Sequence, residues 1–224
     1  MEEFWELSFQ SKKTMWGLEP TNSAIETSEL FKSSGLHNIL IPGFGYGRNA
    51  RVFIEKGLKV TGIEISETAI KLAQKNYRSN SKIYHGSVTD MPFDKKKYDG
   101  IYCYALLHLL NANEREKFIQ DCFNQLKPNG YMVFVTISKK DITYAKGEEI
   151  GKDRFQTKHG VNLFFYDPYS IKKEFGRNGL VDITEIEEPA KSMVNLNSRK
   201  FYKITCKKPS SIFSKEYKRS STNK

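Results

Sequence analysis

Three glycines separated by single aromatic residues form the run Gly43-Phe44-Gly45-Tyr46-Gly47. An apolar stretch over residues 37–42 precedes this run, and a helical pattern follows it over residues 47–56. Glycine lets the backbone turn tightly and approach a ligand without a clash from a Cβ atom. A strand, a glycine-rich turn and a helix in this order predict the first unit of an α/β sheet, with a ligand site at the turn.

Strand and helix patterns alternate along the rest of the chain, which is typical of an α/β domain with a mainly parallel sheet. The last two strands are expected to pair as a hairpin, and the polar region 139–166 is expected to form a loop or small insertion. The sequence predicts further strands over residues 58–65, 82–86, 98–104, 131–138, 180–187 and 199–207.

Local signals predict where several helices begin and end. Gly57 suits a left-handed residue after the first helix, and Ser66 suits the cap of the next one. Asn113 and Glu116 have the spacing of a capping box. A later helix is expected to begin at Asp167, with Pro168 at its first helical position, and to run to about residue 177.

Glu64 lies at the end of the second predicted strand, 21 residues after Gly43. A carboxylate at this place can accept hydrogen bonds from both hydroxyls of a ribose. Dinucleotide sites prefer a third small residue in the pattern G-x-G-x-x-G/A, and this chain has Arg48 there. The loop therefore favours another nucleoside ligand over NAD, and a turn without any ligand stays open as the alternative.

Most of the net charge of +10 lies at one end of the chain. Residues 199–224 contain nine Lys or Arg and one Glu, so that residues 1–198 are nearly neutral. The segment 207–224 is rich in Ser and Lys and is expected to be a mobile tail. A solvated tail is the expectation, and a tail that binds RNA or another polyanion is the alternative.

The cysteines and apolar stretches indicate the compartment. Cys103, Cys122 and Cys206 are odd in number and form no CxxC, which suits a reducing cytoplasm and predicts neither disulfides nor a metal site. The acidic first residues lack the pattern of a signal peptide. No apolar stretch reaches the ~18 residues that a membrane span needs. We therefore expect a cytoplasmic protein that does not bind a membrane.

From about residue 35 to 138 the sequence resembles the class I methyltransferases that use S-adenosylmethionine (SAM). Four motifs carry the resemblance in the expected order: ILIPGFGYG, GIEIS, MPFDKKKYDGIYC and LKPNGYMVFV. The resemblance implies an α/β, Rossmann-like sheet of seven mainly parallel strands in the order 3-2-1-4-5-7-6, with strand 7 antiparallel and helices on both sides. It also implies a helical lid segment at 1–34, a SAM-dependent methyltransferase domain at 35–207 and a basic, flexible tail at 208–224.

The same resemblance implies a set of cofactor contacts, position by position. These are Gly43, Gly45 and Gly47 against the methionine part of SAM, Glu64 on the ribose, Ile65, Ser87, Val88 and Asp90 around the adenine, Tyr104 near the methionine group and Trp16 over the sulfonium. Trp16 has a physical reason to lie there, because an aromatic face attracts a cation. An anchor that fixes the first helix to the core is the alternative for Trp16.

Two departures from the family pattern bear on these contacts. Ile41 and Pro42 replace an Asp that many members carry before the first glycine. The resulting L-x-P-G form is similar to the thiopurine, halide and tellurite-resistance branches, which act on small, soft nucleophiles. Ser87 replaces an Asp that often binds the adenine amino group, so Asp90 is the candidate for that contact.

Methyl transfer from a sulfonium is an in-line displacement, so the protein mainly aligns the nucleophile and excludes water. Tyr104 and His108, near the end of the fourth strand, are candidates for catalysis, and a partly buried helix residue is the alternative for His108. Arg154, His159 and Tyr166 lie where acceptor-binding groups often occur, although a surface role is the expectation for each.

The acceptor is expected to be a small molecule methylated at sulfur, oxygen or nitrogen. The residues after strand four, Cys103-Tyr104-Ala105-Leu106-Leu107, lack the N/D-P-P-Y/F motif of methyltransferases that act on the amino groups of adenine, cytosine or glutamine. An RNA methyltransferase that uses the basic tail is one alternative. A SAM-binding module without turnover and a nicotinamide-dependent reductase are two others.

Overall fold

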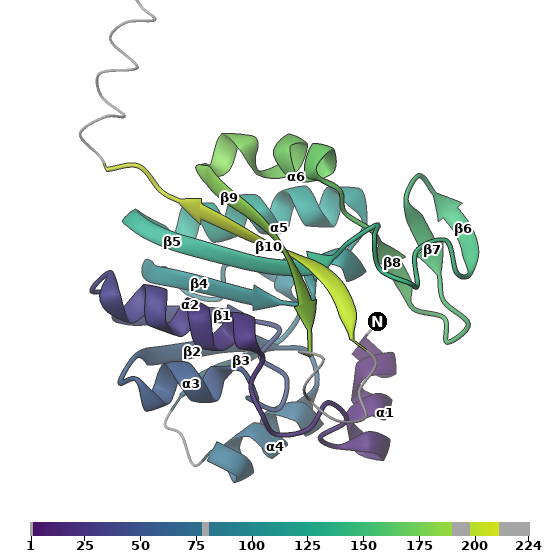
Figure 1. Ribbon diagram of the computed structural model, residues 1–224. Coiled ribbons are helices and arrows are strands. Elements are labelled where there is room, and N and C mark those ends of the chain that lie inside the picture. Colours follow the sequence, from purple (N-terminus) through teal and green to yellow (C-terminus); the bar gives the residue numbers. More distant parts are fainter. Residues whose placement is uncertain (1, 78–80, 190–197, 211–224) are drawn as a thin grey trace, which may run out of the picture.

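The computed structural model describes residues 2–77, 81–189 and 198–210. Its centre is a seven-stranded sheet in the order β3-β2-β1-β4-β5-β10-β9 (Figure 1). The order expected from the sequence is confirmed, because β9 and β10 are the sixth and seventh strands of this sheet, and β10 is antiparallel to both neighbours. The strands are β1 (Asn38–Pro42), β2 (Lys59–Glu64), β3 (Lys82–His85), β4 (Tyr98–Tyr104), β5 (Leu126–Ile137), β9 (Leu180–Glu188) and β10 (Arg199–Lys207).

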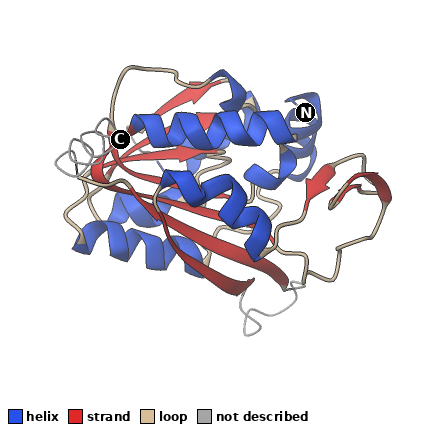
Figure 2. Ribbon diagram, turned by 90° about the horizontal axis from the view of Figure 1, so that it is seen from above, coloured by secondary structure: helices blue, strands red, loops and turns tan. Residues whose placement is uncertain are grey.

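Helices cover both faces of the sheet, as the view from above shows (Figure 2). The core cluster on one face contains residues of α2, α3 and α4, and the cluster on the other face contains residues of α5 and α6. The helices are α1 (Glu2–Lys12), α2 (Asn22–Ser33), α3 (Ala50–Glu55), α4 (Glu67–Tyr77), α5 (Ala112–Gln125) and α6 (Pro168–Phe175), with short 3₁₀ helices η1 (Val88–Asp90), η2 (Leu107–Leu109) and η3 (Gly176–Asn178).

The central strands are mainly apolar and buried because both of their faces are covered. In β4, Ile101 and Cys103 belong to one core cluster, and Tyr102 between them belongs to the other. In β5, Phe134 and Val135 divide between the two clusters in the same way. This alternation fixes the register of the sheet, since a slip by one residue would exchange the two faces.

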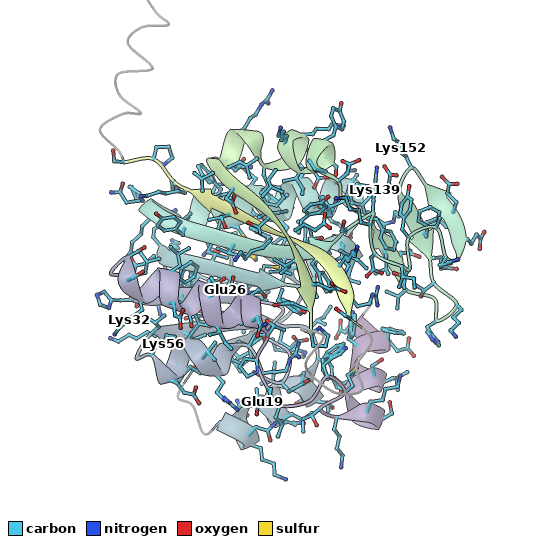
Figure 3. The ribbon with its side chains drawn as sticks, viewed as in Figure 1. Glu19, Glu26, Lys32, Lys56, Lys139 and Lys152 are labelled. Atoms are coloured by element: carbon cyan, nitrogen blue, oxygen red, sulfur yellow. The ribbon has the colours of Figure 1, made fainter. Side chains whose placement is uncertain are left out.

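The insertion expected at residues 139–166 contains a small antiparallel sheet of its own, in the order β6-β7-β8, formed by β6 (Glu148–Gly151), β7 (Arg154–Gln156) and β8 (Asn162–Phe164). Lys139, labelled in Figure 3, forms ion pairs both with the insertion and with the residue that caps α6. Its amine lies 2.7 Å from an oxygen of Asp153 and 2.6 Å from an oxygen of Asp167. The insertion is therefore fixed beside the carboxyl end of β5.

Most of the predicted helix signals are confirmed. The Ser66 hydroxyl accepts the Ala69 N–H at the start of α4, and Gly57 has the left-handed φ of 77°. Pro168 begins α6, which Asp167 caps. The helix expected from residue 47 begins later, at Ala50.

The predicted cap of α5 is wrong by two residues. Asn111 is the cap, and it forms a capping box with Glu114. The sequence contains two overlapping capping-box patterns, which begin at Asn111 and Asn113. The structure uses the earlier one, and Arg115, Phe118, Ile119 and Cys122 then form the buried face of α5.

The described chain continues past β10 in an ordered contact. The Lys208 amine donates to the carbonyls of Phe123 and Leu126, at 2.7 and 2.8 Å. Lys208, expected at the start of the tail, is thus held against the end of α5, whereas residues 211–224 lie outside the described residues. The division into segments 1–34, 35–207 and 208–224 stays a prediction. Within residues 2–77, 81–189 and 198–210, no helix has the length and apolar character to span a membrane.

We expect Gly100→Ala to destabilise the fold, because a Cβ atom on Gly100 would lie 2.7 Å from the Phe31 ring and 3.0 Å from Ile39. Overpacking of this kind costs about 1–3 kcal/mol, which urea denaturation would measure. Gly176→Ala is the matched control, since a Cβ there meets no atom of the described chain within 4 Å. Equal stability of the two variants would contradict the packing described for β4.

Candidate cofactor and acceptor site

A cavity of about 490 Å³ opens at the carboxyl ends of the parallel strands. Its wall includes Gly43 after β1, Glu64 at the end of β2, Tyr104 at the end of β4 and Ile137 at the end of β5. The neighbours β1 and β4 are the place where the strand order reverses, which is where open α/β sheets bind ligands. A second hollow, between α3 and Leu18, lies away from these strand ends.

The three glycines of the loop after β1 have left-handed backbone conformations, with φ of 70° at Gly43, 55° at Gly45 and 84° at Gly47. A Cβ on Gly43 would lie 2.6 Å from a methyl group of Leu106, and the left-handed φ would strain any other residue there. A Cβ on Gly45 would meet no atom of the described chain, and Gly45 lines the cavity. Gly45 is therefore the place where a ligand can approach the backbone closely.

The Glu64 carboxylate lies in the cavity wall, with the side chain buried. One of its oxygens accepts the Gly45 N–H at 2.6 Å, and the other accepts the N–H groups of Ile65 and Ser66 at 2.8 and 2.9 Å. Burial raises the pKa of Glu64, while these three N–H groups act in the opposite direction. A carboxylate offers about four acceptor positions, so the oxygen that faces Gly45 can also accept a hydrogen bond from a ligand hydroxyl.

The segment before α2 lies against the glycine loop. The Trp16 ring stacks on Tyr46, with ring centroids 6.3 Å apart. The Tyr46 hydroxyl donates to the Gly17 carbonyl at 2.7 Å, and Arg48 donates to the Trp16 carbonyl at 3.1 Å. Trp16 thus lines the cavity and also fixes this segment, whereas its contact with a sulfonium stays a prediction.

Glu6 attaches α1 to the start of α4. Its carboxylate accepts hydrogen bonds from the Ser66 hydroxyl at 2.6 Å and from the Thr68 N–H at 3.2 Å, and it also accepts from the Thr68 hydroxyl. The Ser66 and Thr68 bonds lower the pKa of Glu6 to about 2. This contact places Trp5 and Phe9 of α1 in the cavity wall.

Four residues expected at the adenine lie outside the cavity wall as the described residues define it. Ser87 caps η1 by accepting the Thr89 N–H, Val88 is buried in the core, and Asp90 is exposed. Ile65 is half-buried next to Glu64. The adenine contacts of these residues stay predictions.

Tyr104 and His108, the candidates for catalysis, both line the cavity. The three candidates from the insertion, Arg154, His159 and Tyr166, do not line the cavity. Arg154 donates to the Leu110 carbonyl at 2.7 Å, and His159 is exposed. The surface role expected for Tyr166 is wrong, because its ring is fully buried and its hydroxyl donates to Glu174 at 2.7 Å.

Three charged residues of the wall were not predicted as site residues from the sequence, namely Arg48, Glu188 and Arg199. The Glu188 carboxylate is buried and accepts the Ser23 N–H at 2.6 Å, the Ser23 hydroxyl at 3.1 Å and the Tyr104 hydroxyl. Burial raises the pKa of Glu188. Because Ser23 and Tyr104 are distant from Glu188 in the sequence, no local spacing could have indicated this group.

The strand order, the glycine loop beside β1 and the buried carboxylate at the end of β2 together define the class I methyltransferase fold. Residues 40–134 match the family of methyltransferase domains. This part of the chain is thus a class I, SAM-dependent methyltransferase domain.

Similar proteins have several acceptors. Phosphoethanolamine N-methyltransferase of Plasmodium falciparum is 31% identical over 121 residues, which are 52% of this chain and 44% of that protein. Probable thiol methyltransferase 2 of Arabidopsis thaliana is 25% identical over 135 residues, which are 58% of this chain and 59% of that protein. The chain spans about half the length of these relatives.

A solved structure extends the likeness over most of the chain. The 1,6-didemethyltoxoflavin-N1-methyltransferase of Burkholderia thailandensis, with 1,6-didemethyltoxoflavin and S-adenosylhomocysteine bound, superposes with a TM-score of 0.69. The two sequences are 14% identical, and the match covers 93% of this chain and 87% of that one. At this identity the likeness shows the fold.

We predict that acid releases α1 through protonation of Glu6. The folded-state pKa of about 2 lies below the ordinary value of 4.5, so the contact is fully present above about pH 4.5 and is lost as the pH falls toward 2. The chain has two tryptophans, Trp5 and Trp16, and both lie in this N-terminal segment, so acrylamide quenching of their fluorescence reports on it. Glu6→Gln should show strong quenching already at pH 7.

Glu3→Gln is the control, because Glu3 is exposed on the same helix. Circular dichroism at each pH would separate release of α1 from loss of the sheet. Identical quenching of Glu6→Gln and the unaltered protein at pH 7 would show that Glu6 does not hold α1.

Proposed function

We propose that this protein transfers the methyl group of SAM to a small-molecule acceptor at a sulfur, oxygen or nitrogen atom. The observation that carries the proposal is the continuity of the cavity. One cavity includes Gly45 and Glu64 at one end, and Tyr104, His108 and Arg199 at the other. A nucleoside cofactor and an acceptor can therefore lie in direct contact, with no part of the protein between them.

The proposed cofactor end uses the glycine loop and Glu64. The methionine part of SAM lies along Gly43, Gly45 and Gly47, and the ribose hydroxyls bind the Glu64 carboxylate. Support for this placement comes from the unfilled space at Gly45 and from the acceptor position that Glu64 retains. Trp16 and the other aromatic residues of the N-terminal segment cover this end as a lid, which excludes water from the displacement.

The proposed acceptor end begins at Tyr104. Methyl transfer needs no protonation of the leaving group, so the residues here mainly orient the nucleophile. The relatives methylate different acceptors according to their names, which include phosphoethanolamine and a thiol. A cavity of about 490 Å³ has the size of sites for small molecules.

The proposal is tested by calorimetric titration with SAM, S-adenosylhomocysteine and NADH. We expect binding of the first two, and at least a tenfold loss for Glu64→Ala. Each hydrogen bond to a charged group contributes about 1.5–3 kcal/mol, and 1.4 kcal/mol corresponds to about tenfold in affinity. Gly45→Ala should also lose binding, because its methyl group enters the cavity.

Gly35→Ala is the matched control for Gly45→Ala. Gly35 has a similar φ of 69° and free space around a Cβ, and it lies outside the cavity wall of the described chain. Binding of NADH without SAM would contradict the proposal. Binding of SAM without transfer to any thiol, amine, phenol or carboxylate in a broad screen would instead favour a SAM-binding module.

The RNA alternative has its own measurement. Transfer to tRNA that weakens steeply with salt, and that is lost when residues 211–224 are deleted, would identify a nucleic-acid acceptor. Transfer to a small molecule by the shortened chain at the full rate would support the proposal.

A further inference from the structure

His108 lies in η2 and is bound on one side by the backbone of β5. Its Nδ1 atom accepts the Ile137 N–H at 3.2 Å and lies 3.3 Å from the Thr136 hydroxyl. A backbone N–H can only donate, so Nδ1 carries no proton. The proton of the neutral ring is therefore on Nε2.

Burial also keeps this ring neutral. Burial and, to a smaller extent, the nearby positive charge of Arg199 lower the pKa of His108 to about 3, against the opposite effect of Asp141. Near neutral pH, His108 thus offers an Nε2–H donor and cannot accept a proton through that nitrogen. Within the described residues, Nε2 has no hydrogen-bond partner, and His108 lines the cavity.

Arg199 is held rigidly at the start of β10. Its Nε atom lies 3.0 Å from both oxygens of Asp141, and Nη2 donates to the Thr143 hydroxyl at 2.7 Å. The Asp141 carboxylate also accepts the N–H groups of Lys200 and Thr143, so several donors share its charge. Nη1 is left without a partner in the described part of the chain, and Arg199 also lines the cavity.

The wall beside these two donors is apolar. It is formed by Leu109, Val161, Leu163 and Phe201. Two of these come from the insertion: Val161 directly precedes β8, and Leu163 lies in it. Two carboxylates of the wall have other partners: Glu64 binds the glycine loop, and Glu188 binds Ser23 and Tyr104 and lies near the charge of Arg48. The two N–H donors of His108 and Arg199 are thus open at this end, whereas the Glu188 carboxylate already accepts hydrogen bonds from Ser23 and Tyr104.

We propose that this end of the cavity binds the methyl acceptor through a carboxylate of the acceptor, held between the Nε2–H of His108 and the guanidinium of Arg199. The apolar body of the acceptor lies against Val161 and Leu163. The inference rests on the proposed function and names its substrate class, a small carboxylic acid with an apolar body. His108 is a specificity residue in this account, with no role as a base.

The test uses three probes of one size, benzoate, benzamide and benzylamine, titrated into the protein saturated with S-adenosylhomocysteine. Benzoate should bind most tightly, benzamide at least tenfold more weakly because it lacks the charge, and benzylamine least. Tighter binding of benzylamine than of benzoate would overturn the inference.

Two substitutions of His108 separate ligand binding from support of the fold. In His108→Asn, the amide oxygen can still accept the Ile137 N–H, but the donor at Nε2 is lost. In His108→Gln, the amide N–H can replace the Nε2 donor, but the Ile137 N–H loses its acceptor. His108→Asn should therefore weaken benzoate binding at least tenfold, with little change in the melting temperature of the protein. His108→Gln should bind benzoate more tightly than His108→Asn does, but it should melt at a lower temperature than the unaltered protein.

Arg199→Lys is the matched change at the second donor, since Lys keeps the charge beside Asp141 but has no Nη1. Arg199→Lys should weaken benzoate binding at least tenfold, while its affinity for S-adenosylhomocysteine should stay within threefold of that of the unaltered protein. Unchanged benzoate binding in both His108→Asn and Arg199→Lys would overturn the inference. Failure to bind S-adenosylhomocysteine would instead contradict the proposed function, whereas binding of it without benzoate contradicts this inference alone.

Discussion

A buried carboxylate, that of Glu64, ties the first two strands of the sheet to the glycine loop. Its hydrogen bond to the Gly45 N–H joins the loop after β1 to the end of β2, and its bonds to Ile65 and Ser66 fix the turn into α4. Burial of a charge costs several kcal/mol, and each charge-assisted hydrogen bond offsets about 1.5–3 kcal/mol. The left-handed conformation of Gly45 is part of the loop geometry that presents this N–H.

The N-terminal segment depends on the same loop. Tyr46 and Arg48, which lie between and after the glycines, hold Trp16 and Gly17, while Ser66 beside Glu64 holds Glu6 of α1. Arg48, which weighs against a dinucleotide site, thus has a structural role in this chain. The glycine loop and the N-terminal segment form one connected network, so a change in one is expected to affect the other.

The sheet and the meeting of the glycine loop with Glu64 could be predicted from the sequence because their signals are local. The apolar strands, the spacing of Gly43, Gly45 and Gly47 and the position of Glu64 all follow from short stretches of chain. The error at the α5 cap has the same origin, since the local pattern occurs twice and only the packing of α5 selects Asn111. The adenine contacts expected at Ser87, Val88 and Asp90 rest on family resemblance alone.

The proposed acceptor end could not be predicted, because its geometry depends on contacts between distant parts of the chain. Arg199 is fixed by Asp141, which precedes it by 58 residues, and Glu188 is fixed by Ser23, 165 residues away. The protonation of His108 depends on the backbone of Ile137, which no spacing reveals. Tyr166 is likewise buried in a core cluster with residues of α5 and α6, and its hydroxyl donates to Glu174.

The most direct measurement is a crystal structure of the protein with S-adenosylhomocysteine. The account predicts that the nucleoside lies along Gly43, Gly45 and Gly47, with a ribose hydroxyl within hydrogen-bonding distance of the Glu64 carboxylate and its sulfur directed toward Tyr104 and His108. A nucleoside bound elsewhere, or a Glu64 side chain turned away from the ribose, would contradict it.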